Sequence, residues 1–182
     1  MSTYLCTSFF FADKTLMRTT TFSDEDIHAL FQDGPGRQAP CLRASSRSKY
    51  SADCIAKLVS ASGTDPSHLA FLWSTRPWSG GGSARVLPFE DLIPIAQSID
   101  SLLVWSAKSI QVATELLYMD PPGEVKEALK SPVISPNPNE SKKVDSDGFG
   151  ARFLFSYLAS IASVAREAHN SQRSLIFIQS YG

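Results

Sequence analysis

The segment FEDLIPIAQSIDSLLVWSAK, residues 89–108, opens a long apolar stretch of the chain. Its leucine, isoleucine and alanine residues recur every three or four positions, as in a helix that several neighbours bury. We expect one long helix over residues 89–118, because Pro94 falls in the first turn, where proline is tolerated. Residues 144–169 have apolar side chains in near steps of four and predict a second long helix.

The two stretches are separated by DPPGEVKEALKSPVISPNPNESKK, residues 120–143, which contains five prolines. Such a segment cannot be one continuous element, so we expect a polar, proline-rich loop over about residues 119–143. Short helices are predicted after Ser23, where a Ser or Asp cap precedes acidic residues, and after Ser51. The sequence therefore predicts a single domain, residues 1–182, that is mainly α. We expect a four-helix bundle of two short and two long helices, with a small β element and extended termini.

The small β element is predicted from short apolar segments. Residues 4–21 are rich in aromatic and β-branched side chains and indicate extended chain or a hairpin that turns near Asp13. Residues 68–73 and 85–89 are expected to form two short partner strands. Residues 37–49 are expected to form a loop, and Leu175-Ile-Phe-Ile178 an extended apolar tail.

Composition limits the classes of function. The net charge of −1 leaves no basic tail to hold nucleic acid by bulk electrostatics, and it does not oppose self-association. The three cysteines lack a CxxC spacing, which favours structural thiols in a reducing compartment. A basic, apolar leader is absent from the start of the sequence, and charges interrupt both long helices. We expect an intracellular, soluble protein that does not bind membranes.

Catalytic motifs are not found in the sequence. The three histidines stand far apart, and no nucleophile–base pair or metal-ligand spacing occurs. The segment SGGGS, residues 79–83, lacks the Lys-Ser/Thr of a phosphate loop. We therefore predict no catalytic residues, no metal, no cofactor and no enzymatic activity, while an enzyme without a recognisable motif remains an open alternative. The tryptophans and phenylalanines are expected in the core or in contacts between subunits.

Two basic features are candidates for phosphate contact. The first is the cluster Arg37, Arg43, Arg47 and Lys49. The second is Lys142-Lys143, with Asp145, Asp147 and Arg152 just beyond. Each feature is as compatible with a solvated surface as with a phosphate backbone. Acids beside such cations would orient them or accept hydrogen bonds from ribose hydroxyls.

The order of these expected elements resembles that of the coat proteins of rod-shaped, tobamovirus-like plant RNA viruses. Local matches are Met-Ser-x-Tyr at the start, RVLPFEDLI at residues 85–93, and Lys142-Lys-Val-Asp145 before the second long helix. Arg152 falls inside that helix, as an arginine does in the family, and the apolar ending is similar. The family's Phe-Asp-x-Arg-x-Arg signature is absent, and Trp105-Ser-Ala-Lys108-Ser stands in its place.

The resemblance implies a capsid protein of the virion, made in the host cytoplasm, that self-assembles into a helical or disc-like homo-oligomer. Its second partner would be single-stranded RNA, bound without sequence preference. The RNA-binding residues implied are Arg47, Lys108, Lys142, Lys143, Asp145 and Arg152. The alternative is a cellular protein–protein interaction module or assembly adaptor that binds its partner through an aromatic surface.

Overall fold

A computed structural model describes residues 4–32, 39–47, 50–75, 84–117, 121–130, 142–143 and 150–181. Its centre is a five-stranded sheet with the strand order β3-β5-β1-β2-β4. The strands are β1 (Tyr4–Asp13), β2 (Leu42–Arg47), β3 (Ala84–Leu87), β4 (Lys142–Lys143) and β5 (Arg173–Tyr181). Neighbouring strands are antiparallel except for β2 and β4, which run parallel.

The first and last strands form the middle of this sheet. β1 and β5 pair along nearly their whole length, from Leu5 opposite Tyr181 to Asp13 opposite Arg173. Both strands contain runs of adjacent apolar residues, SFFFA in β1 and LIFI in β5. Such runs are typical of strands covered on both faces, because successive side chains point to opposite sides. Accordingly, Phe9 packs in the main core and Phe10 in a second cluster on the other face.

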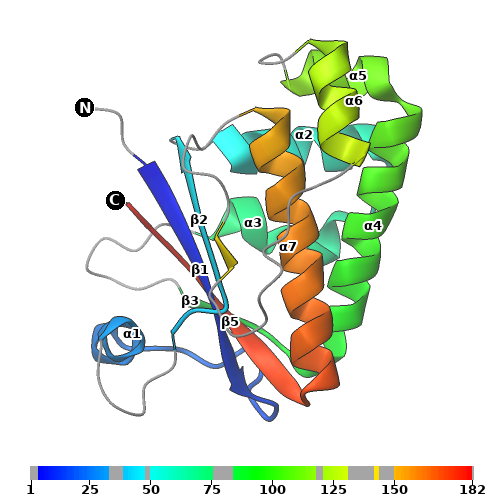
Figure 1. The fold of residues 1–182 in the computed structure, drawn as a ribbon. Coiled ribbons are helices and arrows are strands. Elements are labelled where there is room, and N and C mark those ends of the chain that lie inside the picture. The colour runs from blue at the N-terminus through cyan, green and yellow to red at the C-terminus, as the bar shows by residue number, and fades with distance from the viewer. Residues whose placement is uncertain are drawn as a thin grey trace.

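Helices cover the two faces unequally. Figure 1 shows α2 and α4 to α7 on one side of the sheet and α1 on the other. The helices are α1 (Asp24–Phe31), α2 (Tyr50–Ser62), α3 (Phe71–Ser74), α4 (Leu92–Lys108), α5 (Ile110–Leu117), α6 (Pro122–Lys130) and α7 (Ala151–Asn170). Two 3-10 turns, η1 (Pro66–His68) and η2 (Phe89–Asp91), precede α3 and α4. None of the helices in the described ranges is long and apolar enough to cross a membrane.

Three aromatic rings tie the sheet to the helical layer. Phe177 of β5 lies 4.9 Å from Phe9 and 5.0 Å from Phe71 between ring centroids. The Phe9 and Phe177 side chains are fully buried, and Phe71 is 8% exposed. Contacts at such distances add to the stabilisation from area burial. Phe71 thus fixes the short helix α3 against the middle of the sheet.

A buried hydroxyl of α7 lacks a hydrogen-bond partner among the described residues. The Tyr157 hydroxyl of α7 is buried and makes no hydrogen bond of ordinary geometry. Burial raises the pKa of Tyr157, and the nearby Thr7 hydroxyl opposes this rise only in part. Thr7 itself is oriented toward the Ala44 carbonyl, 3.5 Å away. An unpaired buried hydroxyl costs stability, so this position is not optimised for folding alone.

The prediction of a mainly α four-helix bundle is wrong. The described part of the chain has a mixed α/β fold, in which a sheet and a helical layer share the core. The reason is the pairing of β1 with β5: both segments were expected as extended termini, but together they form the centre of a sheet. A small β element beside a bundle therefore does not describe the protein.

Both short helices were predicted correctly. α1 follows Ser23, whose hydroxyl accepts a hydrogen bond from the Asp26 amide at 3.1 Å. In return the Asp26 carboxylate accepts from the Ser23 amide at 2.8 Å, which completes a capping box. α2 is also present, but Ser51 lies inside its first turn and donates to the Ser46 hydroxyl at 3.1 Å.

Several predicted boundaries need correction. The first long helix is divided at Ser109, with φ −111° and ψ 45°, into α4 and α5. Within the predicted loop, residues 122–130 form α6, whose proline stands in the first turn, where a missing N–H is harmless. Residues 68–73 belong to η1 and α3 instead of a strand, and residues 42–47 form β2 instead of a loop. α7 starts at Ala151, and residues 144–149 lie outside the described ranges.

Candidate functional site

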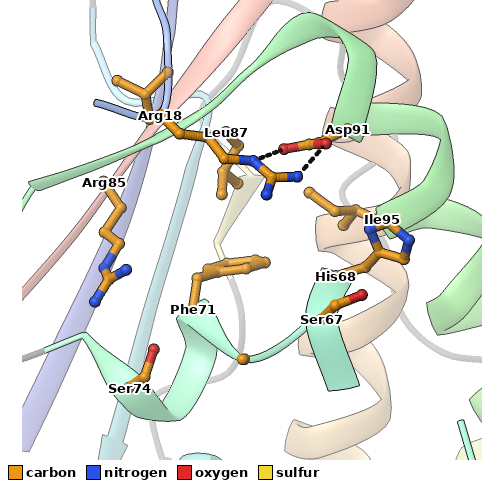
Figure 2. Close-up of a pocket in the computed structure, with 11 residues that line it drawn as sticks. Arg18, Ser67, His68, Phe71, Ser74, Arg85, Leu87, Asp91 and Ile95 are labelled. Carbon is orange, nitrogen blue, oxygen red and sulfur yellow. Dashed lines mark hydrogen bonds and ion pairs between the residues drawn. The ribbon is translucent and has the colours of Figure 1, made fainter. Parts of the chain in front are cut away.

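A small pocket opens beside β3, on the side of the sheet that carries the helical layer. Its volume is about 160 Å³. The apolar part of its lining is Ala70, Phe71, Val86, Leu87 and Ile95. The polar part comprises Arg18, Ser67, His68, Ser74, Arg85 and Asp91. These residues come from the segment between β1 and α1, from η1 and α3, from β3, from η2 and from the start of α4 (Figure 2).

Local sequence signals fix the backbone around the pocket. Asp65 caps the start of η1, because its side chain accepts a hydrogen bond from the Ser67 amide at 2.9 Å. Pro66 follows as the first residue of the turn, where proline is favourable. At the other end the Thr75 hydroxyl donates to the Phe71 carbonyl at 2.7 Å and closes α3. Ser67, His68 and Ser74 are therefore held on a short, tightly turned segment opposite β3.

Arg18 forms an ion pair with Asp91 at one end of the pocket. Its Nε donates to Asp91 Oδ2 at 2.7 Å and its terminal nitrogen to Oδ1 at 2.5 Å. This bidentate contact raises the pKa of Arg18, by hydrogen bonding first and by charge second. Because 65% of the Arg18 side chain is exposed, the pair contributes at most about 1 kcal/mol to stability. Its main effect is to neutralise one guanidinium.

Arg85 occupies the other end of the pocket and lacks a partner among the described residues. In Figure 2 its guanidinium extends on the Ser74 side of the Phe71 ring, while Arg18 and His68 lie beyond that ring. His68 adds a second unsatisfied group, because its Nδ1 is buried without a hydrogen-bond partner. A buried polar atom of this kind usually has a partner in the functional state.

The pocket therefore has a definite chemical character. Among its lining residues the charges of Arg18 and Asp91 cancel, and Arg85 leaves one positive charge above an apolar floor. Guanidinium groups, serine hydroxyls and an imidazole nitrogen can all donate to oxygen atoms. A carboxylate or a phosphate group fits this set of donors, since guanidinium geometry matches both.

Metal binding and acyl transfer are not supported at this site. In the described ranges, no group of three or more His, Cys, Asp or Glu side chains is placed to hold a metal ion. His68 Nδ1 has no acceptor, so the hydrogen bond that would orient a catalytic imidazole is not formed there. The arrangement can bind an anion, and it shows no nucleophile activated by a base.

The residues predicted to bind RNA lie elsewhere. Lys108 is exposed at the end of α4 and Arg152 is exposed in the first turn of α7. Both belong to the end of the helical layer near α5 and α6 (Figure 1). Lys142 and Lys143 form β4, and Arg47 ends β2. Asp145 lies outside the described ranges.

The sheet brings the two basic segments of the sequence together. β4 pairs in parallel with β2, which places Lys142 beside Leu42 and Lys143 beside Arg43. Arg47 follows four residues further along β2, or about 13 Å. Lys108 and Arg152 are on helices and are not part of this edge. Three residues of the predicted RNA-binding set, Arg47, Lys142 and Lys143, thus lie on the neighbouring strands β2 and β4. Their contact with RNA stays a prediction.

Sequence reasoning missed every polar residue of the β3 pocket. Arg18 and Asp91 are 73 residues apart, so no local motif connects them. Arg85 and Asp91 lie in the RVLPFEDLI segment, which the sequence analysis used only as a local match to the coat-protein family. The one usable signal was Asp65-Pro66-Ser67, which is typical of a helix start and argues against a strand at residues 68–73.

Comparison with known proteins gives no further guide, since no family model, curated protein or solved structure matches the chain.

Proposed function

We propose that this protein is a binding module that recognises an anionic group of a larger partner in the β3 pocket. The observation that carries the proposal is Arg85, a guanidinium that has no ion pair among the described residues and lines a pocket with an apolar floor. Arg18 is already matched by Asp91, so an incoming carboxylate or phosphate would meet Arg85 first.

The size of the pocket supports a larger partner over a small metabolite. Pockets for drug-sized ligands span about 300–1,000 Å³, whereas this pocket has about 160 Å³. It accommodates one side chain or one end group. Most of the contact area needed for specific binding must then come from the surface around it. A protein–protein interaction module meets this requirement.

The coat-protein hypothesis stays a prediction. It rested on the order of the elements and on local sequence matches, whereas the four-helix bundle expected with it is replaced by the sheet centred on β1 and β5. RNA binding by Lys142, Lys143 and their neighbours stays a prediction. The β3 pocket favours the interaction module, because the charge of Arg85 has no partner among the described residues and borders a pocket with an apolar floor.

Nuclear magnetic resonance titration with sodium acetate and with inorganic phosphate tests the proposal. At constant ionic strength and pH, we expect saturable shifts at the Arg85 Nε–H and the Ser74 amide. Arg85→Gln should abolish these shifts, while the matched control Arg173→Gln, at an exposed arginine of β5, should preserve them. Shifts spread over all cations, or shifts that persist in Arg85→Gln, would refute the proposal.

A further inference from the structure

Strand β3 is an edge of the sheet within the part of the chain that the structure describes. β5 pairs with one side of it, and no described strand pairs with the other. An edge strand presents backbone N–H and C=O groups that can pair with an added strand. Peptides that bind in this way gain affinity from main-chain hydrogen bonds and specificity from alternate side chains.

The side chains of β3 alternate between the two faces of the sheet. Arg85 lies opposite Phe177 and Leu87 opposite Leu175, both partners being in the main core under the helical layer. Val86 lies opposite Ile176, which belongs to the cluster on the other face. The pocket therefore adjoins the Arg85–Leu87 face. A strand added to β3 would place every second side chain on this same face.

We infer that the partner is an extended peptide segment that pairs with β3 and places an acidic side chain opposite Arg85. Directly opposed residues in an antiparallel pair have Cβ atoms about 4.5–5.5 Å apart, within reach of a carboxylate–guanidinium contact. Two positions along, an apolar side chain would face Leu87. The recognised pattern is thus an acid and an apolar residue separated by one position. This inference rests on the proposed function and assigns its partner.

Charge argues against a second copy of this chain as the occupant. Ala84–Leu87 contains Arg85 and no acidic residue. Pairing two β3 strands would bring two unpaired guanidinium groups onto one small patch, and like charges at such positions destabilise a strand pair. An acidic peptide supplies the opposite charge. It also completes the hydrogen bonds of the edge.

Eight-residue peptides of alternating Thr and Val with one inward-facing Glu provide the test, with both ends blocked. We expect fluorescence anisotropy to show binding, and the Glu→Gln peptide to bind weaker by on the order of tenfold. Arg85→Glu should lose the Glu peptide and gain a Lys peptide. The control Arg173→Glu should change neither affinity.

N-methylated peptides separate strand pairing from capture of the acid alone. Methyl groups on the amides that face β3 should abolish binding, whereas methyl groups on the alternate amides should leave it intact. Equal binding of both peptides would overturn the inference, and so would a wild-type dimer that forms through β3 and excludes the peptide. If acetate still shifts Arg85 in that case, the proposed anion site stands; if neither acetate nor peptide affects Arg85, both proposals fail.

Discussion

Phe177→Ala tests whether β5 belongs to the middle of the core. The Phe177 side chain is fully buried and contacts the Phe9 and Phe71 rings. Truncation of a buried phenylalanine costs about 3–5 kcal/mol. Each lost aromatic contact accounts for about 0.5–1.5 kcal/mol beyond area burial. We therefore expect Phe177→Ala to lower the free energy of unfolding by about 4–5 kcal/mol, near the upper end of this range.

Urea unfolding followed by circular dichroism measures this change. Phe177→Leu, which keeps aliphatic bulk and loses the ring contacts, should cost about 1–3 kcal/mol. Tyr181→Ala serves as the matched control on the same strand, because 47% of the Tyr181 side chain is exposed; it should cost less than about 1 kcal/mol. A cost below about 1.5 kcal/mol for Phe177→Ala would refute the reasoning. It would restore the expectation that residues 175–178 are a peripheral tail.

Four further outcomes follow from the structure and the sequence. Ser23→Ala should lower the free energy of unfolding by about 1 kcal/mol at pH 7, because the Asp26 amide loses its acceptor. Hydrogen bonds from the Ser23 amide and hydroxyl hold the pKa of Asp26 below its usual value. The variant loses only the hydroxyl contribution, so the difference between wild type and variant should shrink, without vanishing, as pH falls through the folded-state pKa of Asp26. Tyr157→Phe should leave stability unchanged or raise it, since it removes a buried hydroxyl without a partner; a loss above about 1 kcal/mol would show that the hydroxyl is bonded. For the RNA prediction, the double change Lys142→Ala and Lys143→Ala should weaken binding to different single strands equally and reduce its salt dependence, and an unchanged slope against salt would separate the pair from RNA. If the chain self-assembles, sedimentation at high concentration from mildly acidic to neutral pH should show species larger than the monomer; a monomer boundary throughout would contradict this prediction.

Helices were predictable where their signals are local. The Ser23–Asp26 capping box and the apolar spacing of residues 92–108 depend only on neighbours in sequence, and both give helices in the structure. α6 was missed because its proline, Pro122, was assigned to the loop, although proline in a first turn is compatible with a helix. Residues 68–73 form an apolar run too short to distinguish a strand from a buried helical turn by periodicity.

The sheet and the pocket depend on contacts that are distant in sequence. The apolar runs in β1 and β5 indicate buried strands, but nothing in either run specifies that they pair with each other. The pocket depends on that pairing, because β3 is positioned by β5 and Phe71 by Phe177. Arg18 then reaches Asp91 across segments that the sequence alone does not place together.

The pairing of β1 with β5 also determines how this protein must fold. Every hydrogen bond between β1 and β5 closes a loop that contains almost the whole sequence. The chain loses the entropy of closing such a loop before the contacts between the strands can stabilise the fold. During synthesis β1 is made before β5 and keeps one unpaired edge, with Phe9 and Phe10 lacking their β5 neighbours, until β5 has been made. Such exposed strands are prone to aggregate. We therefore expect refolding to be slow, because the central pair of strands is also the pair most distant in sequence.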